Sequence, residues 1–230
     1  MEHRHIYDRM KEDPVFGVIG GGSWATALVK LLSENGWRLN WYMRDTDAIE
    51  HIEKYHHHSK YLTSVELDAD SFTITNNMDY VVSESDILIF AIPSAYFLKE
   101  VSRVTASYDG KILISAVKGF VGERYLTVAE YFHHDHKVPF DRIGVISGPC
   151  HAEEVGMERL SYITVSSKHQ KVAEYLCGFF KNRYVNTIAG TDIYGVEYAA
   201  ALKNVYAVAA EQFIQLPVGQ GKKLFTTLAA

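Results

Sequence analysis

The stretch that most constrains this chain is Val-Phe-Gly-Val-Ile-Gly-Gly-Gly-Ser-Trp-Ala-Thr-Ala-Leu at residues 15–28. A short apolar run breaks at three glycines, and apolar residues then resume at helical spacing. This pattern predicts a strand, a tight turn and a helix. We expect Gly20 to adopt the unusual backbone angles of the turn and Gly22 to let the main chain approach a ligand. The small side chain of Ala25 would let the helix pack closely on the strand.

The same stretch matches the dinucleotide fingerprint G-x-G-x-x-G/A, in which backbone N–H groups at a helix N-terminus hold a pyrophosphate. Glycines at a strand-to-helix turn can also be purely structural. Three features favour the binding interpretation. The motif lies near the chain start, it follows a strand, and a second apolar run at residues 38–43 comes at the expected distance.

The residue after that second strand indicates which dinucleotide is bound. An acidic residue there holds the ribose 2′-hydroxyl of NAD, whereas an Arg accommodates the 2′-phosphate of NADP. This chain has Arg44 followed by Asp45, which favours NADP, or the use of both NADP and NAD. The alternative is that Arg44 is a solvated charge and Asp45 caps the next helix, at residues 47–55.

Further apolar runs alternate with helical patterns, and their continuous apolar character is typical of a parallel sheet covered on both faces. The predicted strands are 72–75, 86–92, 111–115, 143–147, 162–166 and 184–188, and the predicted helices are 77–84, 96–104, 124–132 and 171–180. A long helix begins at Asp192 with no strand after it. We therefore predict an α/β, doubly wound, Rossmann-type, mostly parallel sheet. Residues 1–190 would form this domain, and residues 191–230 the first, incomplete part of an α-helical substrate domain.

Three predicted strands end in loops that combine Pro or Gly with polar groups, and such ends bind ligands in open α/β sheets. These loops contain Pro93, Lys118 and the pair Gly148 and Cys150. Lys118 would hold a substrate oxygen or phosphate as a point charge. The equal alternative is that Lys118 is a solvated loop lysine. No partnered base accompanies Cys150, so a nucleophilic role is not expected.

Lys203 is the most informative charge, because the helical run from 196 to 210 carries only Glu197 besides it. Burial on so apolar a helix would desolvate the ammonium and lower its pKa towards the range useful for proton transfer. The neighbouring Asn204 adds an amide donor. The alternative is a lysine that extends its ammonium to water from a helix packed on the core.

Composition excludes several classes of function. With 47% hydrophobic and 22% charged residues and a net charge of -5, we expect a soluble globular protein without a basic surface for nucleic acid. No apolar run approaches the roughly 20 residues of a membrane span, so a cytoplasmic location is expected. The two cysteines, Cys150 and Cys177, favour a reducing compartment. The histidine runs at 56–58 and 133–136 are expected in solvated loops, not in a metal site.

Five motifs together resemble NAD(P)-dependent glycerol-3-phosphate dehydrogenase of the bacterial type, in that family's order and spacing over about residues 14–210. They are Gly-Gly-Gly-Ser-Trp-Ala-Thr-Ala-Leu at 20–28, Ala-Ile-Pro-Ser at 91–94, Val-Lys-Gly at 117–119, Ser-Gly-Pro at 147–149 and Ala-Leu-Lys-Asn-Val at 201–205. The resemblance implies reversible hydride transfer between sn-glycerol 3-phosphate and dihydroxyacetone phosphate, which supplies glycerophospholipid synthesis.

The resemblance also implies roles for individual residues. Lys203 would be the general base for alcohol oxidation, Lys118 would contact both cofactor and substrate, and Arg44 would lie near the adenosine ribose. The candidate cofactor-binding residues are Gly20, Gly22, Ser23, Trp24, Arg44, Pro93, Lys118 and Ala152, and the candidate substrate-binding residues are Lys118, Gly148, Cys150, Lys203 and Asn204.

The chain departs from the family in two places. Cys150 and His151 stand where the family usually has Ser-Phe, which weakens any hydroxyl contact at 150. After about residue 210 the likeness fades, although family members continue into a helical domain whose acidic residue and Arg-Asn pair hold substrate. We expect a truncated or frameshifted chain, in which Lys222 and Lys223 would replace an Arg fork poorly.

Three functions therefore remain open. The first is the dehydrogenase, acting on a phosphorylated triose or polyol. The second is a dinucleotide-binding module without turnover. The third is a different reductase on a similar fold, against which the Ala-Leu-Lys-Asn helix argues. Exposed apolar faces near residues 193–216 would favour self-association, for example as a homodimer.

Overall fold

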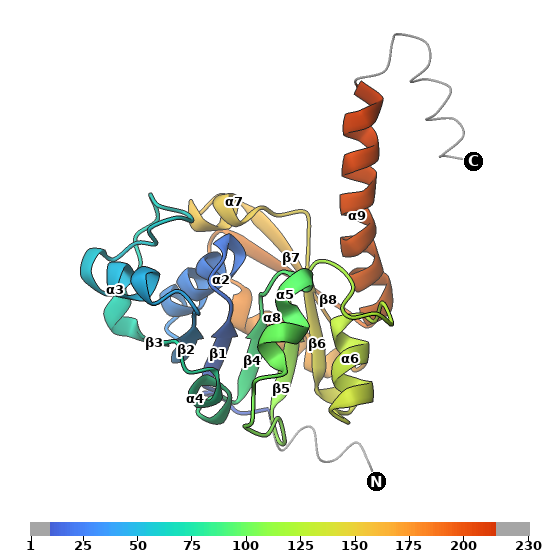
Figure 1. Ribbon diagram of the computed structural model, residues 1–230, viewed down its shortest axis with the longest axis horizontal. Helices are drawn as coiled ribbons and strands as arrows, with labels where there is room; N and C mark the ends of the chain where they lie inside the picture. The colour runs from blue at the N-terminus through green and yellow to red at the C-terminus, as the bar shows by residue number, and fades with distance from the viewer. Residues whose placement is uncertain (1–9, 215–230) are drawn as a thin grey trace.

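The computed structural model describes residues 10–214, and its centre is one eight-stranded sheet with the order β3-β2-β1-β4-β5-β6-β7-β8 (Figure 1). The strands are β1 (Phe16–Ile19), β2 (Leu39–Tyr42), β3 (Phe72–Thr75), β4 (Ile87–Phe90), β5 (Ile112–Ser115), β6 (Ile143–Ser147), β7 (Ser161–Ser167) and β8 (Val185–Gly190). The first six are parallel in the order 3-2-1-4-5-6, which is the doubly wound topology. β7 runs antiparallel to β6 and pairs in parallel with β8. The predicted fold class, a mostly parallel sheet, is confirmed.

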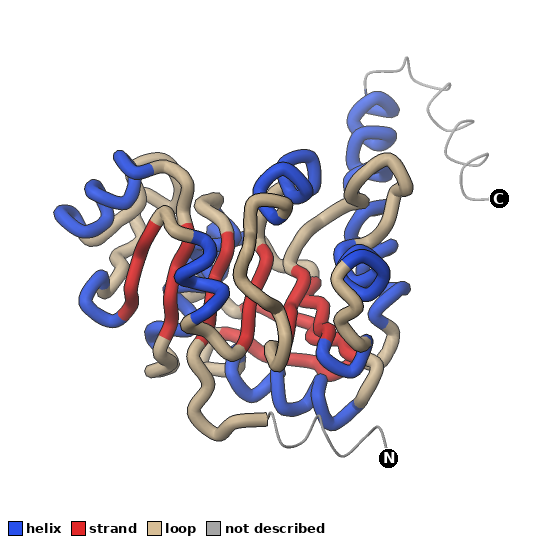
Figure 2. Tube along the Cα trace, turned by 60° about the horizontal axis from the view of Figure 1, so that its bottom comes forward, coloured by secondary structure: helices blue, strands red, loops and turns tan. Residues whose placement is uncertain are grey.

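Helices cover both faces of this sheet, as Figure 2 shows. They are α2 (Ser23–Glu34), α3 (Thr46–Tyr55), α4 (Met78–Ser83), α5 (Ser94–Val101), α6 (Val128–Asp135), α7 (Ala152–Gly156), α8 (Gln170–Phe180) and α9 (Ile193–Ile214), with short 3-10 turns η1 (Ala69–Ser71) and η2 (Phe140–Arg142). One buried cluster joins the sheet to α2, α3 and α8, and a second joins it to α4, α5 and α6. Every residue of β1 and β4 is buried, as expected for strands covered on both sides.

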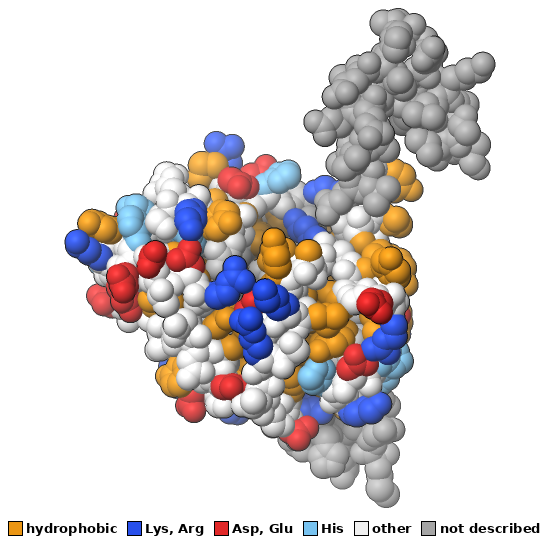
Figure 3. All heavy atoms as spheres, viewed as in Figure 1, with side chains coloured by type: hydrophobic (Ala, Val, Ile, Leu, Met, Phe, Trp, Pro, Cys, Tyr) orange, Lys and Arg blue, Asp and Glu red, His pale blue; other side chains and the backbone are white. Residues whose placement is uncertain are grey.

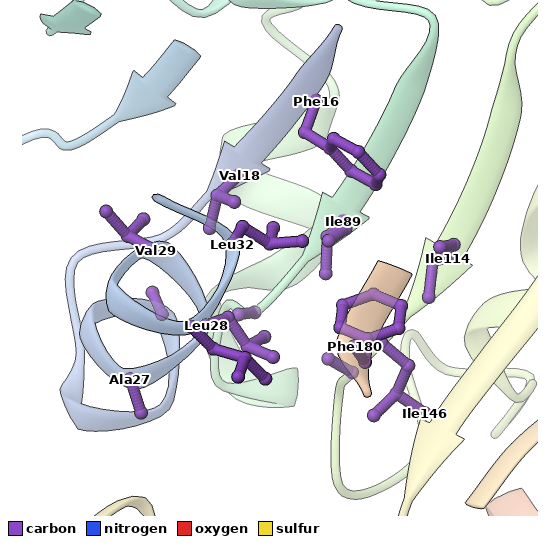
Figure 4. Close-up of a cluster of buried hydrophobic side chains, with 14 of the residues drawn as sticks. Phe16, Val18, Ala27, Leu28, Val29, Leu32, Ile89, Ile114, Ile146 and Phe180 are labelled. Carbon is purple, nitrogen blue, oxygen red and sulfur yellow. The ribbon is translucent and has the colours of Figure 1, made fainter. Parts of the chain in front are cut away.

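The first cluster fixes the helix that follows the glycine turn. Leu28 and Leu32 of α2 point towards the sheet, where they pack with Ile89 of β4 (Figure 4). Phe180, at the end of α8, fills the same layer and is fully buried. Truncating such a buried aromatic residue costs about 3–5 kcal/mol of stability. Because Phe180 and the leucines of α2 belong to the same buried cluster, the core of the domain holds α2 in place.

The helix predicted at 124–132 is wrong at its start. α6 begins only after Thr127, whose hydroxyl accepts from the Glu130 N–H at 3.2 Å while the Glu130 carboxylate accepts from the Thr127 N–H at 2.9 Å. This reciprocal capping box ends the preceding turn, in which Tyr125 has a φ of 51°. The helix also ends three residues later than predicted, at Asp135, which places His133 and His134 in its last turn and not in a loop. The sequence Thr-x-x-Glu carried the signal.

α9 leads away from the sheet in Figure 1. It begins three residues after β8 ends, close to the predicted boundary at residue 190; the division into two domains stays a prediction. Among residues 10–214, we find no helix with the length and hydropathy of a membrane span.

Candidate functional site

The glycine turn joins β1 to α2 at the carboxyl ends of the parallel strands. Gly20 has a φ of +144°, and a Cβ there would lie 2.4 Å from the Ala91 carbonyl oxygen. Only glycine fits both constraints. A Cβ at Gly22, the N-cap of α2, would meet nothing within 4 Å. Gly20 is thus required by the chain's own backbone, whereas the space at Gly22 lies open in front of a helix N-terminus, where anions bind.

His58 supports this turn from the loop after α3. Its ring is 1% exposed, and its Nδ1 accepts from the Lys60 N–H at 3.0 Å. Nε2 therefore carries the proton and donates to the Gly21 carbonyl oxygen at 3.2 Å. Burial lowers the pKa of His58, which keeps the ring neutral. The prediction that the run 56–58 is a solvated loop is wrong for His58, because a run of identical residues gave no signal of which ring is buried.

A pocket of about 300 Å³ opens beside the turn. It is lined by Gly20, Gly21, Gly22, Tyr42, Met43, Arg44, Asp45, His58, Lys60, Tyr61, Ile92, Pro93, Tyr96 and Glu100. Four predicted cofactor-binding residues, Gly20, Gly22, Arg44 and Pro93, therefore line one pocket. Tyr42, Tyr61, Tyr96 and Glu100 of this lining were not predicted from the sequence, because they come from segments whose patterns indicated only packing.

Two ion pairs contribute to the lining of this pocket. Asp45 accepts from the Ala48 N–H at 3.3 Å, capping α3, and from Lys60 Nζ at 2.8 Å. The Lys60 ammonium and the Ala48 N–H together lower the pKa of Asp45. The capping alternative for Asp45 is confirmed. Arg44 is not a solvated charge alone, because its guanidinium donates to Glu100 Oε1 at 3.1 Å while two thirds of its side chain stays exposed.

A second group of predicted residues gathers around Cys150. The Lys118 ammonium lies 5.8 Å from the centroid of the Trp24 ring at the start of α2. Cys150 is buried, and this burial raises the pKa of its thiol. The positive charges of Lys118 and Lys203 act in the opposite direction and lower the pKa, but burial has the larger effect. The charges of both lysines thus act on the same thiol. A thiol with a raised pKa is a poor nucleophile at neutral pH.

Lys203 itself is exposed in the described part of the chain, so the prediction that its ammonium is desolvated is wrong there. The reason is geometric. α9 buries a narrow stripe formed by Ile193, Glu197 and Ala201, which are four residues apart and lie on one face. Lys203 follows Ala201 by two residues and so projects from a different face.

Four predicted site residues remain: Ser23, Gly148, Ala152 and Asn204. A Cβ at Gly148 would lie 2.4 Å from the Tyr162 carbonyl oxygen, so glycine is needed there for packing on β7. Ser23 and Ala152 are the first residues of α2 and α7. The side chain of Asn204 lies outside those that the structure describes. Binding roles for these four residues stay predictions. Within residues 10–214, no three or more His, Cys, Asp or Glu side chains are grouped to hold a metal ion.

The parallel sheet in 3-2-1-4-5-6 order, with a glycine turn and a pocket at its carboxyl edge, defines a Rossmann-type nucleotide-binding protein. Residues 16–173 match the family model described as NAD-dependent glycerol-3-phosphate dehydrogenase N-terminus. The chain therefore belongs to the NAD-dependent glycerol-3-phosphate dehydrogenase family.

Individual relatives agree with this assignment. The glycerol-3-phosphate dehydrogenase, NAD(P)+, of Pseudomonas syringae is 31% identical over 212 residues, which cover 92% of this chain and 61% of the relative. The Streptococcus pyogenes protein of the same name is 32% identical over 208 residues, covering 90% and 61%. The solved glycerol-3-phosphate dehydrogenase of Plasmodium falciparum superposes with a TM-score of 0.81 at 22% identity, covering 96% of this chain and 65% of that one. The chain thus spans about three fifths of the length of its curated relatives.

Proposed function

We propose that this chain binds NADP or NAD and acts as an oxidoreductase that interconverts sn-glycerol 3-phosphate and dihydroxyacetone phosphate. The observation that carries the proposal is the pocket at the N-terminus of α2, with open space at Gly22 and the partly free guanidinium of Arg44 on its wall. These features fit a dinucleotide, because the helix N-terminus suits a pyrophosphate and an Arg at the end of β2 suits the adenosine ribose.

The roles of the chain's residues follow from this placement. The backbone of residues 20–22 would hold the pyrophosphate, with Ser23 at the first turn of α2 and Pro93 on the pocket wall. When bound, the nicotinamide supplies or accepts the hydride at the substrate carbon. Lys203 would donate a proton to the oxygen on that carbon in reduction and accept it in oxidation. Lys118 would stabilise the negative charge that develops on the same oxygen.

Lys118 and Lys203 support the proposal that a phosphorylated substrate binds to this chain. Lys118 and Lys203 both act electrostatically on Cys150, so a phosphorylated triose or polyol bound there would meet two ammonium groups. We place Gly148, Cys150 and Asn204 at the substrate and Ala152 at the cofactor as parts of the same proposal. Trp24, beside the Lys118 ammonium, would link this group to the cofactor.

A second candidate function is nucleotide binding without turnover. The exposure of Lys203 favours it, since an ammonium in contact with water keeps its solvation and gains little from a neighbouring substrate. A titration with NADPH followed by addition of dihydroxyacetone phosphate separates the two functions. Both predict saturable NADPH binding, and only the dehydrogenase predicts loss of the reduced-nicotinamide absorbance. An absence of NADPH and NADH binding would contradict both.

The setting of the activity belongs to the same proposal. We place the protein in the cytoplasm, where it would supply glycerol 3-phosphate for phospholipid synthesis. We also propose a homodimer, supported by the exposed side chains of Tyr198, Leu202 and Tyr206 on α9, which are 43%, 43% and 64% accessible. Light scattering after size-exclusion chromatography tests it, and a mass of 26.0 kDa at all concentrations would contradict it.

A further inference from the structure

The wall of the pocket beyond Arg44 contains a buried carboxylate that the proposed chemistry does not use. Glu100, in the last turn of α5, has a side chain only 6% exposed. It accepts from the Tyr42 hydroxyl at 3.2 Å and from the Arg44 guanidinium at 3.1 Å. A carboxylate so far removed from water needs such partners. Glu100 therefore fixes where the otherwise exposed Arg44 side chain lies.

A second arginine uses the same carboxylate. Arg103 follows α5, its backbone N–H donates to the Glu100 carbonyl at 3.2 Å, and its guanidinium lies 3.9 Å from Glu100 Oε2. Its side chain is 60% exposed, so most of its donors face solvent. In Figure 3, Lys and Arg side chains gather over α5 on this face of the molecule. One arginine from the end of β2 and one from the end of α5 thus meet over a single carboxylate.

The charges of this cluster do not cancel. The guanidinium groups of Arg44 and Arg103 share the Glu100 carboxylate, which leaves a net charge of +1 on these three side chains. The charges of both arginines also act on the Tyr42 hydroxyl, which bonds to the same carboxylate. Burial and the Glu100 carboxylate raise the pKa of that hydroxyl, and the charges of Arg103 and Arg44 oppose the rise. Since the carboxylate is buried and both guanidinium groups are exposed, an approaching anion would meet the arginines first.

We infer that Arg44 and Arg103 together form a subsite for the 2′-phosphate of NADP(H), with Glu100 as the positioning residue that holds the two guanidinium groups side by side. The inference rests on the proposed function, because it assumes that the pocket takes a nicotinamide dinucleotide. A phosphate monoester presents three oxygens, and two planar guanidinium forks can contact them with more than one hydrogen bond each. NADH lacks this group and would gain nothing from Arg103.

The experiment measures the dissociation constants of NADPH and NADH for the full chain and for Arg103→Gln, Arg103→Lys and Arg44→Gln. We expect Arg103→Gln to weaken NADPH binding about tenfold, the equivalent of one charge-assisted contact, with NADH unchanged within about twofold. Arg103→Lys keeps the charge without the fork and should recover part of the loss. Arg44→Gln should also reduce the preference for NADPH. The matched control is Lys181→Gln, which removes an exposed positive charge between α8 and β8.

The outcomes separate this inference from the function on which it rests. A wild-type chain that binds NADH, with a ratio of NADPH to NADH affinity that Arg103→Gln leaves within twofold, overturns the subsite alone. An equal loss in Lys181→Gln also overturns it, because the effect would then be one of overall charge. A wild-type chain that binds neither nucleotide overturns both proposals. The thermal unfolding temperature of each variant is measured as well, and we expect it to match the wild type because the substituted side chains are exposed.

Discussion

The two walls of the site are built differently. On the nucleotide side, the glycine turn is fixed by contacts with its own domain: Gly20 packs against the backbone of Ala91, just after β4, and His58 hydrogen-bonds to the Gly21 carbonyl. On the α9 side, Lys203 is exposed, and the buried side chains that the structure describes on this helix form a narrow stripe of Ile193, Glu197 and Ala201. From this difference we expect nucleotide binding and turnover to depend on separate parts of the chain, so that a substitution can remove one without the other.

The largest effect is expected on the α9 side. Lys203→Ala should abolish turnover of dihydroxyacetone phosphate, a loss of about a hundredfold or more for a proton-transfer group, while NADPH affinity stays within a few fold. Steady-state kinetics and a binding titration on the same variant check this. Lys181→Ala is the matched control. Comparable turnover in Lys203→Ala would refute the assigned role.

The next effect lies in the glycine turn, where two neighbouring positions should respond in opposite ways. Gly20→Ala meets a positive φ and a backbone oxygen, so we expect a loss of about 3 kcal/mol or more in the free energy of unfolding. Gly22→Ala has room for its Cβ and should cost only a few tenths of a kcal/mol, but the methyl group would weaken nucleotide binding. Urea unfolding and NADPH titration measure the two. Equal losses of stability would show that the turn has no ligand-specific position.

The glycine turn and the strands around it were predicted from the sequence. The strand–turn–helix pattern and the alternation of apolar runs predicted the parallel sheet, because backbone periodicity and glycine chemistry are local. The reversal of β7 against β6 was not predicted, since strand direction depends on long-range packing. The family resemblance assigned Lys118, Cys150 and Lys203 to one site, and that grouping stays a prediction.

The parts that the sequence could not supply are tertiary contacts between distant segments. Glu100 lies under Arg44 although 56 residues separate them, and nothing in the helical pattern of α5 marks it. His58 is buried within a run of three identical side chains. The desolvation expected for Lys203 failed because an apolar helix sequence does not state how much of the helix surface is covered.

A smaller effect should appear with pH on the nucleotide side. Burial lowers the pKa of His58 below its usual 6.5, so the unfolded chain takes up a proton before the folded chain does. Stability is therefore fully present above pH 6.5 and is lost as the pH falls below it, by up to about 1.4 kcal/mol for each unit of pKa difference. Thermal melts between pH 7.5 and 5.5 measure the loss, and His58→Gln should reduce it.

The control for this prediction is His136, whose pKa is also lowered by burial, but which bonds to Tyr131 on the other side of the sheet. His136→Gln should reduce the acid sensitivity as well, with NADPH affinity unchanged, whereas His58→Gln should also weaken NADPH binding. If both variants bind NADPH like the wild type, His58 does not support the turn.

The smallest effect is expected at the foot of α9. Burial raises the pKa of Glu197 above its usual 4.5, although the Ala129 N–H donates to its carboxylate. A raised carboxyl pKa means that stability is lost as the pH rises from 4.5 through the folded value. Glu197→Gln removes this cost and should raise stability at pH 7 by about 1 kcal/mol at most. Denaturant unfolding at pH 5 and pH 7 checks it; a variant less stable at pH 7 would contradict it.

The most direct measurement is a calorimetric titration of the chain and of Gly22→Val with NADPH. If the pocket at the N-terminus of α2 is the nucleotide site, the wild type shows saturable binding of one NADPH per chain. Gly22→Val, with its side chain in the open space in front of the helix, shows none while melting near the wild-type temperature. Equal binding by the two proteins would contradict this placement of the nucleotide.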